Sequence, residues 1–440
     1  MLEKFQKHIN KNLNFLKESK LLIAISGGLD SVVLTHLCHK LKLDFALAHC
    51  NFNLRGKESD ADESFVLQLA KDLNKECFIE CFDTLAYAQE NKLSIQMAAR
   101  ELRYNWFNEL AEQLQFDYIL TAHHADDNLE TFLINLSRGT GIEGLTGIPE
   151  INENVVRPLL PFSREDIEQY ARAENLHWRE DNSNASTKYL RNKLRLEVIP
   201  KFKEVNPQLL QNFNKTIAHL QDSKVIIDDR IDAISNQVIE DINDDNMNFN
   251  IAEIVKLSNP KAYLYELLKD YNFTQWNDIY DLLEAQSGKY VVSATHRLIK
   301  DRGCLLLSQL NKNVHSSAVE SYLIEESTKQ FKTPLGTLFL ETTKQLNKLN
   351  ASTIYVDKEV LKFPLTVRQW QEGDYFYPFG MKGKKKLSKF FKDEKLSLIE
   401  KENVLLLCSG DDIVWVINRR PDDRFKVTES TKKILKIILK

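Results

Sequence analysis

The chain has 440 residues with a formal net charge of −4, and 43% of them are hydrophobic, a length that predicts roughly three domains with real cores. Its six cysteines include no C-x-x-C pair, and the N-terminal residues show neither a signal peptide nor a membrane span. These features argue against a disulfide-rich secreted protein and a membrane protein, and favour a reduced, cytoplasmic location. The net charge alone does not indicate whether the chain binds nucleic acid.

The first chemical signal is the stretch 21–34, which predicts a short buried strand, a Gly-Gly turn and a helix. Two adjacent glycines let a ligand approach the backbone, and a helix N-terminus offers free N–H groups to an anion. The stretch therefore predicts a phosphate site made of Ser26, Gly27, Gly28, Leu29, Asp30 and Ser31. An ordinary turn in which Asp30 or Ser31 caps the helix is the alternative.

Asp30 favours the phosphate site over the ordinary turn. A carboxylate beside phosphates is repulsive unless a divalent cation bridges them, so Asp30 indicates Mg²⁺ on a nucleotide polyphosphate. No Lys-Ser/Thr pair follows the glycines, and the third glycine of the dinucleotide fingerprint is missing. The Walker loop and the dinucleotide loop are thereby excluded.

Strands and helices alternate after this loop. The predicted strands are 44–50, 77–82 and 118–122, and the predicted helices between them are 58–73 and 94–114. Such alternation predicts an α/β fold with a doubly wound parallel sheet and right-handed crossovers.

The helix 94–114 carries two arginines, Arg100 and Arg103, three positions apart and therefore on one face. The small Ala98 and Ala99 beside them allow close packing that would direct guanidinium groups into a cleft, where they could grip phosphate. A solvated helix face is the alternative.

A polar cluster at 123–131 follows the strand 118–122 and holds two histidines and three acids. No cysteine joins them, which argues against structural zinc. Asp127 and Glu130 lie three positions apart on the predicted helix, so they could jointly hold a cation such as an ammonium group or hydrated Mg²⁺.

A basic segment, 188–203, contains six Lys/Arg and one Glu, and predicts a helix stopped by Pro200. Its Arg191, Arg195 and Tyr189 would suit contact with RNA phosphates. A solvated basic face is the alternative.

The whole chain is predicted to form three domains, at 1–215, 216–350 and 351–440. The middle one combines helix and strand signals, and the last is a small α+β domain.

Residues 366–440 carry 17 Lys/Arg and 11 Asp/Glu. Their lysine cluster is interleaved with aromatic residues, which is typical of an RNA-binding surface, although a solvated loop is the alternative. The residues concerned are Lys384, Lys385, Lys386, Phe379, Phe390 and Phe391.

These segments together resemble one family. The hexapeptide 26–31 is similar to the SGGxDS signature of the ATP pyrophosphatases, or PP-loop enzymes, whose fold is adenine nucleotide α-hydrolase-like. Across 21–200 and 368–428 the chain resembles the tRNA(Ile)-lysidine synthases, whereas the middle region does so weakly. Two positions depart from the family pattern: Phe52 replaces a frequent histidine, and Tyr375 replaces a frequent arginine.

The resemblance implies a reaction. Such an enzyme uses ATP and Mg²⁺ to adenylate C2 of the wobble cytidine in the CAU anticodon of tRNA(Ile), which releases pyrophosphate. Free L-lysine then displaces AMP and forms lysidine, so that the tRNA reads AUA instead of AUG and its identity changes from methionine to isoleucine. The implied setting is cytoplasmic, without a membrane, and a homodimer is expected.

The resemblance also implies roles for individual residues. Asp30 holds the metal, while Arg103 or Arg100 stabilises the developing charge. Asp127 and Glu130 bind the α-ammonium of lysine or a metal rather than the nucleophilic amine, because adjacent carboxylates would favour its unreactive ammonium form. His123 or His124 is the candidate for proton transfer. Further implied positions are Arg195, as catalytic, and Arg191, Lys384, Lys385 and Lys386, as tRNA-binding.

Three alternatives keep part of this pattern. A base thiolase of the same superfamily would show paired cysteines, which this chain lacks. A synthetase of NAD or GMP would not need the basic, aromatic C-terminal region. A non-catalytic, nucleotide-gated RNA-binding protein would keep the glycine loop and could dispense with Asp127 and Glu130.

Overall fold

The computed structural model describes residues 1–180, 190–243, 246–310, 321–346 and 350–440. The chain forms two compact units, Met1–Asp229 and Arg230–Lys440, and each is described by itself. Within the described part of the chain, no helix is both long enough and apolar enough to span a bilayer.

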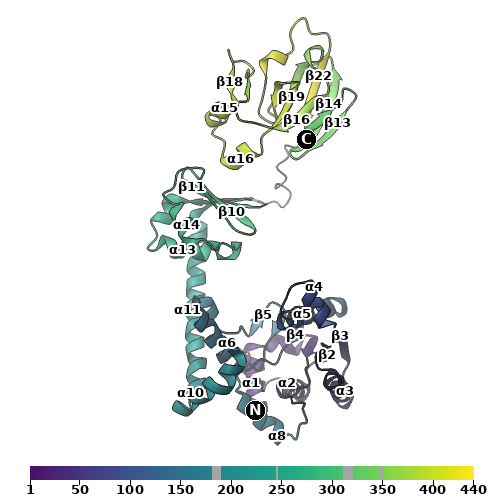
Figure 1. The fold of residues 1–440 in the computed structure, drawn as a ribbon, viewed down its shortest axis with the longest axis vertical. Coiled ribbons are helices and arrows are strands. Elements are labelled where there is room, and N and C mark those ends of the chain that lie inside the picture. The colour runs from purple at the N-terminus through teal and green to yellow at the C-terminus, as the bar shows by residue number, and fades with distance from the viewer. Residues whose placement is uncertain (181–189, 244–245, 311–320, 347–349) are drawn as a thin grey trace. The chain divides into compact units, whose positions relative to one another are not determined.

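The first unit is built on a six-stranded sheet with the order β3-β2-β1-β4-β6-β5 (Figure 1). All neighbouring pairs are parallel except β5 with β6. The register places Leu21 of β1 opposite Phe45 of β2 and Tyr118 of β4. The strands are β1 (Leu21–Ala24), β2 (Phe45–Asn51), β3 (Cys77–Cys81), β4 (Tyr118–Leu120), β5 (Ile151–Asn152) and β6 (Val155–Val156).

Helices cover both faces of this sheet, as alternate side chains of β1 demonstrate. Leu21 and Ile23 belong to a core shared with helices α1, α2, α3 and α8, whereas Leu22 points to a second core that α5 closes with Phe107 and Ala111. A strand with both faces buried must be apolar throughout. The predicted doubly wound α/β fold is confirmed.

The helices of the first unit largely follow the predicted pattern, but the sequence analysis missed α4, α7 and α8. Their bounds are α1 (Leu2–Asn12), α2 (Leu29–Lys40), α3 (Lys57–Asp72), α4 (Thr84–Glu90), α5 (Ile95–Leu114), α6 (Ala125–Arg138), α7 (Ile142–Leu145), α8 (Arg164–Ala173), α9 (Leu190–Lys193), α10 (Ile199–Val205) and α11 (Leu209–Val238).

The predicted stop at Pro200 is wrong. A π-helical turn, Leu194–Val198, follows α9, and Pro200 lies in the first turn of α10. Proline is tolerated there because the N–H it lacks would have no partner inside the helix. The helical path therefore continues to Val205, while Tyr189 lies outside the described residues.

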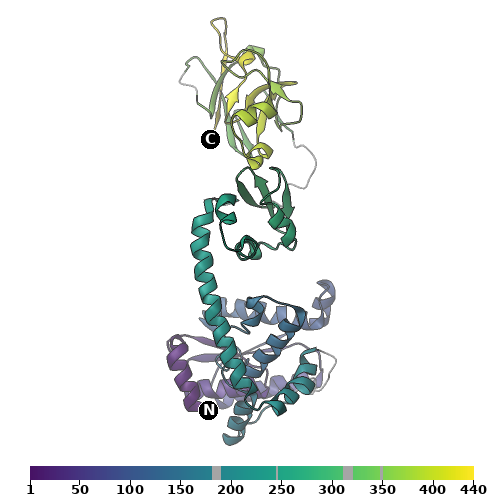
Figure 2. The same ribbon diagram turned by 90° about the vertical axis from the view of Figure 1, so that its left-hand side faces the viewer.

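The second unit begins with the end of α11 and a five-stranded antiparallel sheet of order β7-β8-β11-β10-β9. Its core draws Ile234 and Val238 from α11, the long teal helix of Figure 2. The elements are β7 (Ile239–Asn243), β8 (Asn246–Asn250), β9 (Tyr290–Val292), β10 (His296–Asp301), β11 (Cys304–Gln309), α12 (Ile251–Val255), α13 (Pro260–Leu268) and α14 (Trp276–Asp281).

Two further sheets, β12-β16-β19-β20-β21 and β13-β14-β22-β15, share a core around the buried Trp415. Strands β12 and β14 precede residue 351 in the chain but pair with β16 and β22 after it, so a domain boundary at 350/351 divides both sheets. The strands are β12 (Tyr322–Ile324), β13 (Gln330–Thr333), β14 (Gly336–Thr343), β15 (Thr353–Asp357), β16 (Leu365–Gln369), β19 (Leu405–Ser409), β20 (Asp412–Val416), β21 (Arg420–Pro421) and β22 (Ile434–Leu439).

A small helical and hairpin layer belongs to the same part of the chain. Its elements are β17 (Tyr375–Phe376), β18 (Lys385–Lys386), α15 (Leu387–Asp393) and α16 (Leu398–Glu402).

Candidate active site

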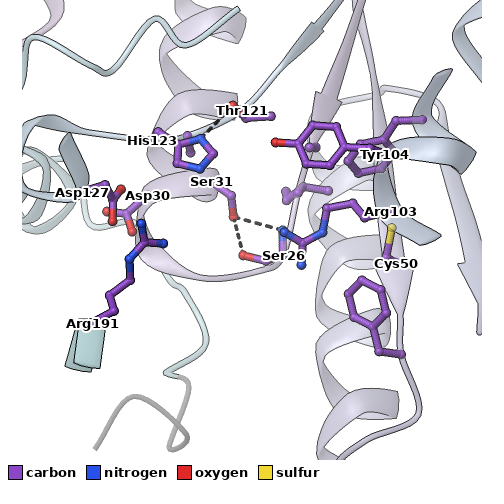
Figure 3. A pocket seen from close by; sticks show the side chains of 15 residues that line it. Ser26, Asp30, Ser31, Cys50, Arg103, Tyr104, Thr121, His123, Asp127 and Arg191 are labelled. Atoms are coloured by element: carbon purple, nitrogen blue, oxygen red, sulfur yellow. Dashed lines mark hydrogen bonds between the residues drawn. The ribbon is translucent and has the colours of Figure 1, made fainter. Parts of the chain in front are cut away.

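The glycine loop lies between the end of β1 and the start of α2, at the carboxyl edge of the parallel sheet, where open α/β sheets bind ligands. Gly27 has φ +84°, a conformation that side chains disfavour. The Ser31 hydroxyl donates to the Gly28 carbonyl at 2.9 Å, and its oxygen accepts the Ser26 N–H at 3.2 Å (Figure 3). These bonds hold the loop in a fixed, open curve.

Asp30 lies in the first turn of α2 and faces two cavities, of about 270 and about 650 Å³. Its carboxylate accepts a hydrogen bond from the Arg164 guanidinium, and the His124 Nε2 atom lies 3.8 Å from the same oxygen. One carboxylate at the junction of two cavities is a suitable place for a cation that must serve ligands on both sides.

The smaller cavity brings the glycine loop together with α5. Arg103 lines it and lies 5.2 Å above the Phe52 ring, whereas Arg100 is not part of its described lining and instead stacks on Tyr104 at 4.8 Å. Figure 3 shows the Arg103 guanidinium directed toward Ser26. The geometry thus favours Arg103 over Arg100 as the phosphate contact.

Asp127 and Glu130 do share one face of α6, and they do hold a cation. That cation is the guanidinium of Arg195, whose Nε lies 2.6 Å from Glu130 Oε1 and whose Nη2 lies 2.9 Å from both Glu130 Oε2 and Asp127 Oδ1. Glu130 is 1% exposed, and burial raises its pKa despite the ion pair. Any ligand of this pair must therefore bind in the presence of Arg195.

Arg191 extends this cluster. Arg191 Nε lies 3.6 Å from Glu130 Oε2, and the Arg191 side chain reaches the smaller cavity beside Asp30 and Asp127 (Figure 3). The predicted positions Asp30, Asp127, Arg191 and Arg195 come from four separate elements and meet within one region. Their catalytic and binding roles stay predictions.

The histidines at the start of α6 differ in their surroundings. His123 lines the smaller cavity, and its Nδ1 is 3.0 Å from Thr121 Oγ1. Burial lowers the pKa of His123 to about 4, so its ring is neutral at pH 7. His124 is buried, with Nε2 3.4 Å from Asp127 Oδ2, and its Nδ1 has no hydrogen-bond partner among the described residues.

The larger cavity contains residues that the sequence analysis missed. Asp126 accepts the Arg164 backbone N–H at 2.8 Å and the Lys203 ammonium at 2.6 Å. Arg179 donates its backbone N–H to the Gly27 carbonyl at 2.9 Å and its Nε to Asp62 at 2.8 Å. One available signal was that Arg164 opens a helix shortly after a strand of the sheet, at the edge where ligands bind.

Comparison with known proteins decides the family. A PP-loop domain family matches residues 1–202, a TilS substrate binding domain matches residues 242–310, and a TilS substrate C-terminal domain matches residues 365–438. The tRNA(Ile)-lysidine synthase of Parabacteroides distasonis is 40% identical over 440 residues, covering 99% of both chains. The chain belongs to the tRNA(Ile)-lysidine synthase family. The enzyme of the same name from Bacteroides thetaiotaomicron is 39% identical and covers 98% of this chain and 97% of its own.

Among the solved structures that the chain matches is the U34-tRNA thiolase NcsA from Methanococcus maripaludis, with a TM-score of 0.42 and 16% identity. The match covers 50% of this chain and 79% of that chain. The family resemblance predicted from sequence is confirmed by the full-length relatives.

The C-terminal lysines of this lysidine synthase homologue occupy distinct environments. Lys384 lies 5.0 Å above the exposed Tyr375 ring, and Lys385 pairs with Asp393 at 2.7 Å, while Lys386 is exposed. Lys385 also lies 5.7 Å above the Phe390 ring, although Phe390 and Phe391 are themselves buried in the core beneath α15. Phe379, the other ring predicted beside these lysines, is exposed.

Proposed function

We propose that this chain is an ATP-dependent tRNA ligase that joins free L-lysine to C2 of the wobble cytidine in the CAU anticodon of tRNA(Ile). The reaction forms lysidine and releases AMP and pyrophosphate. The supporting observation is the likeness to lysidine synthases over the whole chain, together with a glycine loop whose Asp30 faces both cavities.

Binding of ATP is assigned to Ser26–Ser31, with Arg103 at the phosphates. Mg²⁺ bound at Asp30 would neutralise polyphosphate charge and assist departure of pyrophosphate. The described residues contain no group of three or more His, Cys, Asp or Glu side chains placed to hold a metal. A single carboxylate fits an ion that takes its other ligands from phosphate and water, as Mg²⁺ commonly does.

The first step activates the base. The cytidine O2 attacks the α-phosphorus of ATP, the bond to the bridging oxygen breaks, and pyrophosphate leaves. Loop N–H groups and the Arg103 guanidinium stabilise the negative charge that develops on the phosphate oxygens. Arg103 extends from α5 and the loop precedes α2, so two segments packed on the same sheet would hold the reacting phosphate in position.

The second step uses the lysine ε-amine, whose ordinary pKa of about 10.4 means that it must lose a proton before it attacks C2 and displaces AMP. We assign the Asp127, Glu130 and Arg195 cluster to the other end of lysine. The two carboxylates would accept the α-ammonium, and Arg195 would meet the α-carboxylate. Keeping the ε-amine away from the carboxylate pair avoids stabilising its unreactive ammonium form.

Pyrophosphate release tests this function directly. We expect [α-³²P]ATP to yield AMP and pyrophosphate only when tRNA(Ile) with a CAU anticodon is present, and lysine to enter the tRNA in equal amount. The matched control is tRNA(Ile) with a UAU anticodon, which lacks the cytidine. Formation of ADP and phosphate, or turnover without tRNA, would contradict the proposal.

The C-terminal lysines give a second test. Replacing Lys384 and Lys386 with alanine should weaken binding to all tRNAs alike and flatten the slope of log affinity against log salt by roughly 0.7 to 0.9 per lost phosphate contact. Filter binding at several salt concentrations measures both effects. The control is Lys401→Ala in α16. An unchanged slope with normal affinity would show a solvated loop and move the RNA contact to Arg191.

A cytoplasmic location and a homodimer also remain expectations. Cell fractionation and native mass spectrometry test them.

A further inference from the structure

The larger cavity is lined by four basic side chains, Arg164, Arg179, Arg195 and Lys203. Three of them pair with carboxylates that are largely buried. Arg179 bonds Asp62 at 2.8 Å, Arg195 bonds Glu130 at 2.6 Å, and Lys203 bonds Asp126 at 2.6 Å. These three cations have fixed structural partners.

Arg164 differs from them because its partner is Asp30, the carboxylate assigned above to Mg²⁺. The side chains of this pair are 44% and 27% exposed, so solvent screens it and it is readily exchanged. When Mg²⁺ occupies Asp30, Arg164 loses its partner while it stays in the same cavity as Ser26, Gly28 and Leu29.

The backbone of Arg164 is anchored, which keeps its side chain close to the glycine loop. Arg164 is the first residue of α8, after the N-cap Ser163. Its N–H donates to Asp126, which is 8% exposed and also bonds Lys203. A guanidinium released from Asp30 therefore stays beside the glycine loop, where its planar donors match two phosphate oxygens.

We propose that Arg164 is a pyrophosphate-binding residue, which pairs with Asp30 in the empty site and moves onto the β- and γ-phosphates when Mg²⁺ takes that carboxylate. The pairing neutralises Asp30 before the nucleotide arrives. The transfer to phosphate then stabilises the leaving group. This inference rests on the proposed ATP to AMP and pyrophosphate reaction.

Equilibrium binding distinguishes phosphate binding by Arg164 from a role in which Arg164 only competes with Mg²⁺ for Asp30. By calorimetry on the full chain with magnesium pyrophosphate as the probe, Arg164→Met should weaken binding about 10- to 100-fold, the loss typical of one charge-assisted contact. The affinity for AMP, which lacks the β- and γ-phosphates, should stay unchanged. If Arg164 only competes with Mg²⁺ for Asp30, the same change would tighten magnesium pyrophosphate binding, and that result would overturn the proposal.

A matched control lies on the same helix. Arg172 is also an arginine of α8, with its side chain 72% exposed and paired with Glu168, so Arg172→Met should leave both affinities unchanged. Arg164→Lys keeps the charge without the planar fork and should bind pyrophosphate with intermediate affinity, which also serves if the methionine variant does not fold.

The inference and the proposed function fail in different ways. If the wild-type chain releases AMP and pyrophosphate but Arg164→Met and Arg164→Lys bind magnesium pyrophosphate as well as the wild type, only the role of Arg164 is wrong. If the wild-type chain produces ADP, the proposed function falls and the inference falls with it.

Discussion

Asp30→Asn should lower the formation of AMP and pyrophosphate by about a thousandfold, the scale of losing a major source of charge stabilisation at the reacting phosphate. Asparagine has nearly the same shape but no charge to hold Mg²⁺ against the polyphosphate. Single-turnover release of pyrophosphate with saturating tRNA measures the effect on the first step alone.

The fold should survive this change. The Asp30 carboxylate pairs with Arg164 across a partly exposed contact, and such pairs usually contribute about 1 kcal/mol or less to stability. Thermal unfolding of the variant should therefore resemble that of the wild type. The control is Glu168→Gln, a carboxylate in the lining of the same larger cavity. Normal pyrophosphate release by Asp30→Asn would show that another group holds the metal.

Asp127→Asn should raise the KM for lysine by about 10- to 100-fold, as expected for losing a hydrogen bond to a charged group, while adenylated tRNA still forms. The reason is that the Asp127 carboxylate accepts its hydrogen bonds from Arg195 and from the His124 backbone N–H rather than from the glycine loop. Trapping the adenylated tRNA without lysine and then adding lysine separates the two steps.

Glu130→Gln should affect lysine use in the same direction, although its burial makes a loss of stability part of the result, so its unfolding must be measured alongside. Glu165→Gln is the control, since Glu165 is exposed in the lining of the larger cavity. A block of adenylation by Asp127→Asn with unchanged lysine affinity would identify the pair as a metal site.

Local sequence patterns were sufficient for the sheet and for the glycine loop. The residues of β1 and the glycines after them are contiguous, so burial on both faces and the sharp turn are visible without knowledge of distant segments. The two short helices α4 and α7 were missed because four to seven residues carry too little periodicity to stand out.

Contacts between distant segments were beyond such patterns. Arg164 lies 134 positions from Asp30 and Arg195 lies 65 positions from Glu130, so no spacing rule links them. Helical spacing was sufficient to predict that Asp127 and Glu130 share one face of α6, but their partner Arg195 could be identified only once α6 and the π-helical turn were placed together. The prediction at Pro200 was wrong because the rule that proline ends a helix was applied at a position where a new helix, α10, begins.

The small apolar cluster under α11 bears on how the chain can be dissected. Phe213 and Ile217 of α11 pack with Leu129 of α6 and Ile199 of α10, although the PP-loop family match ends at residue 202. A fragment cut at that homology limit would present bare apolar side chains on the same helix that carries Asp127 and Glu130, and it would tend to aggregate. Truncations meant to isolate the nucleotide-binding half should therefore keep the first turns of α11.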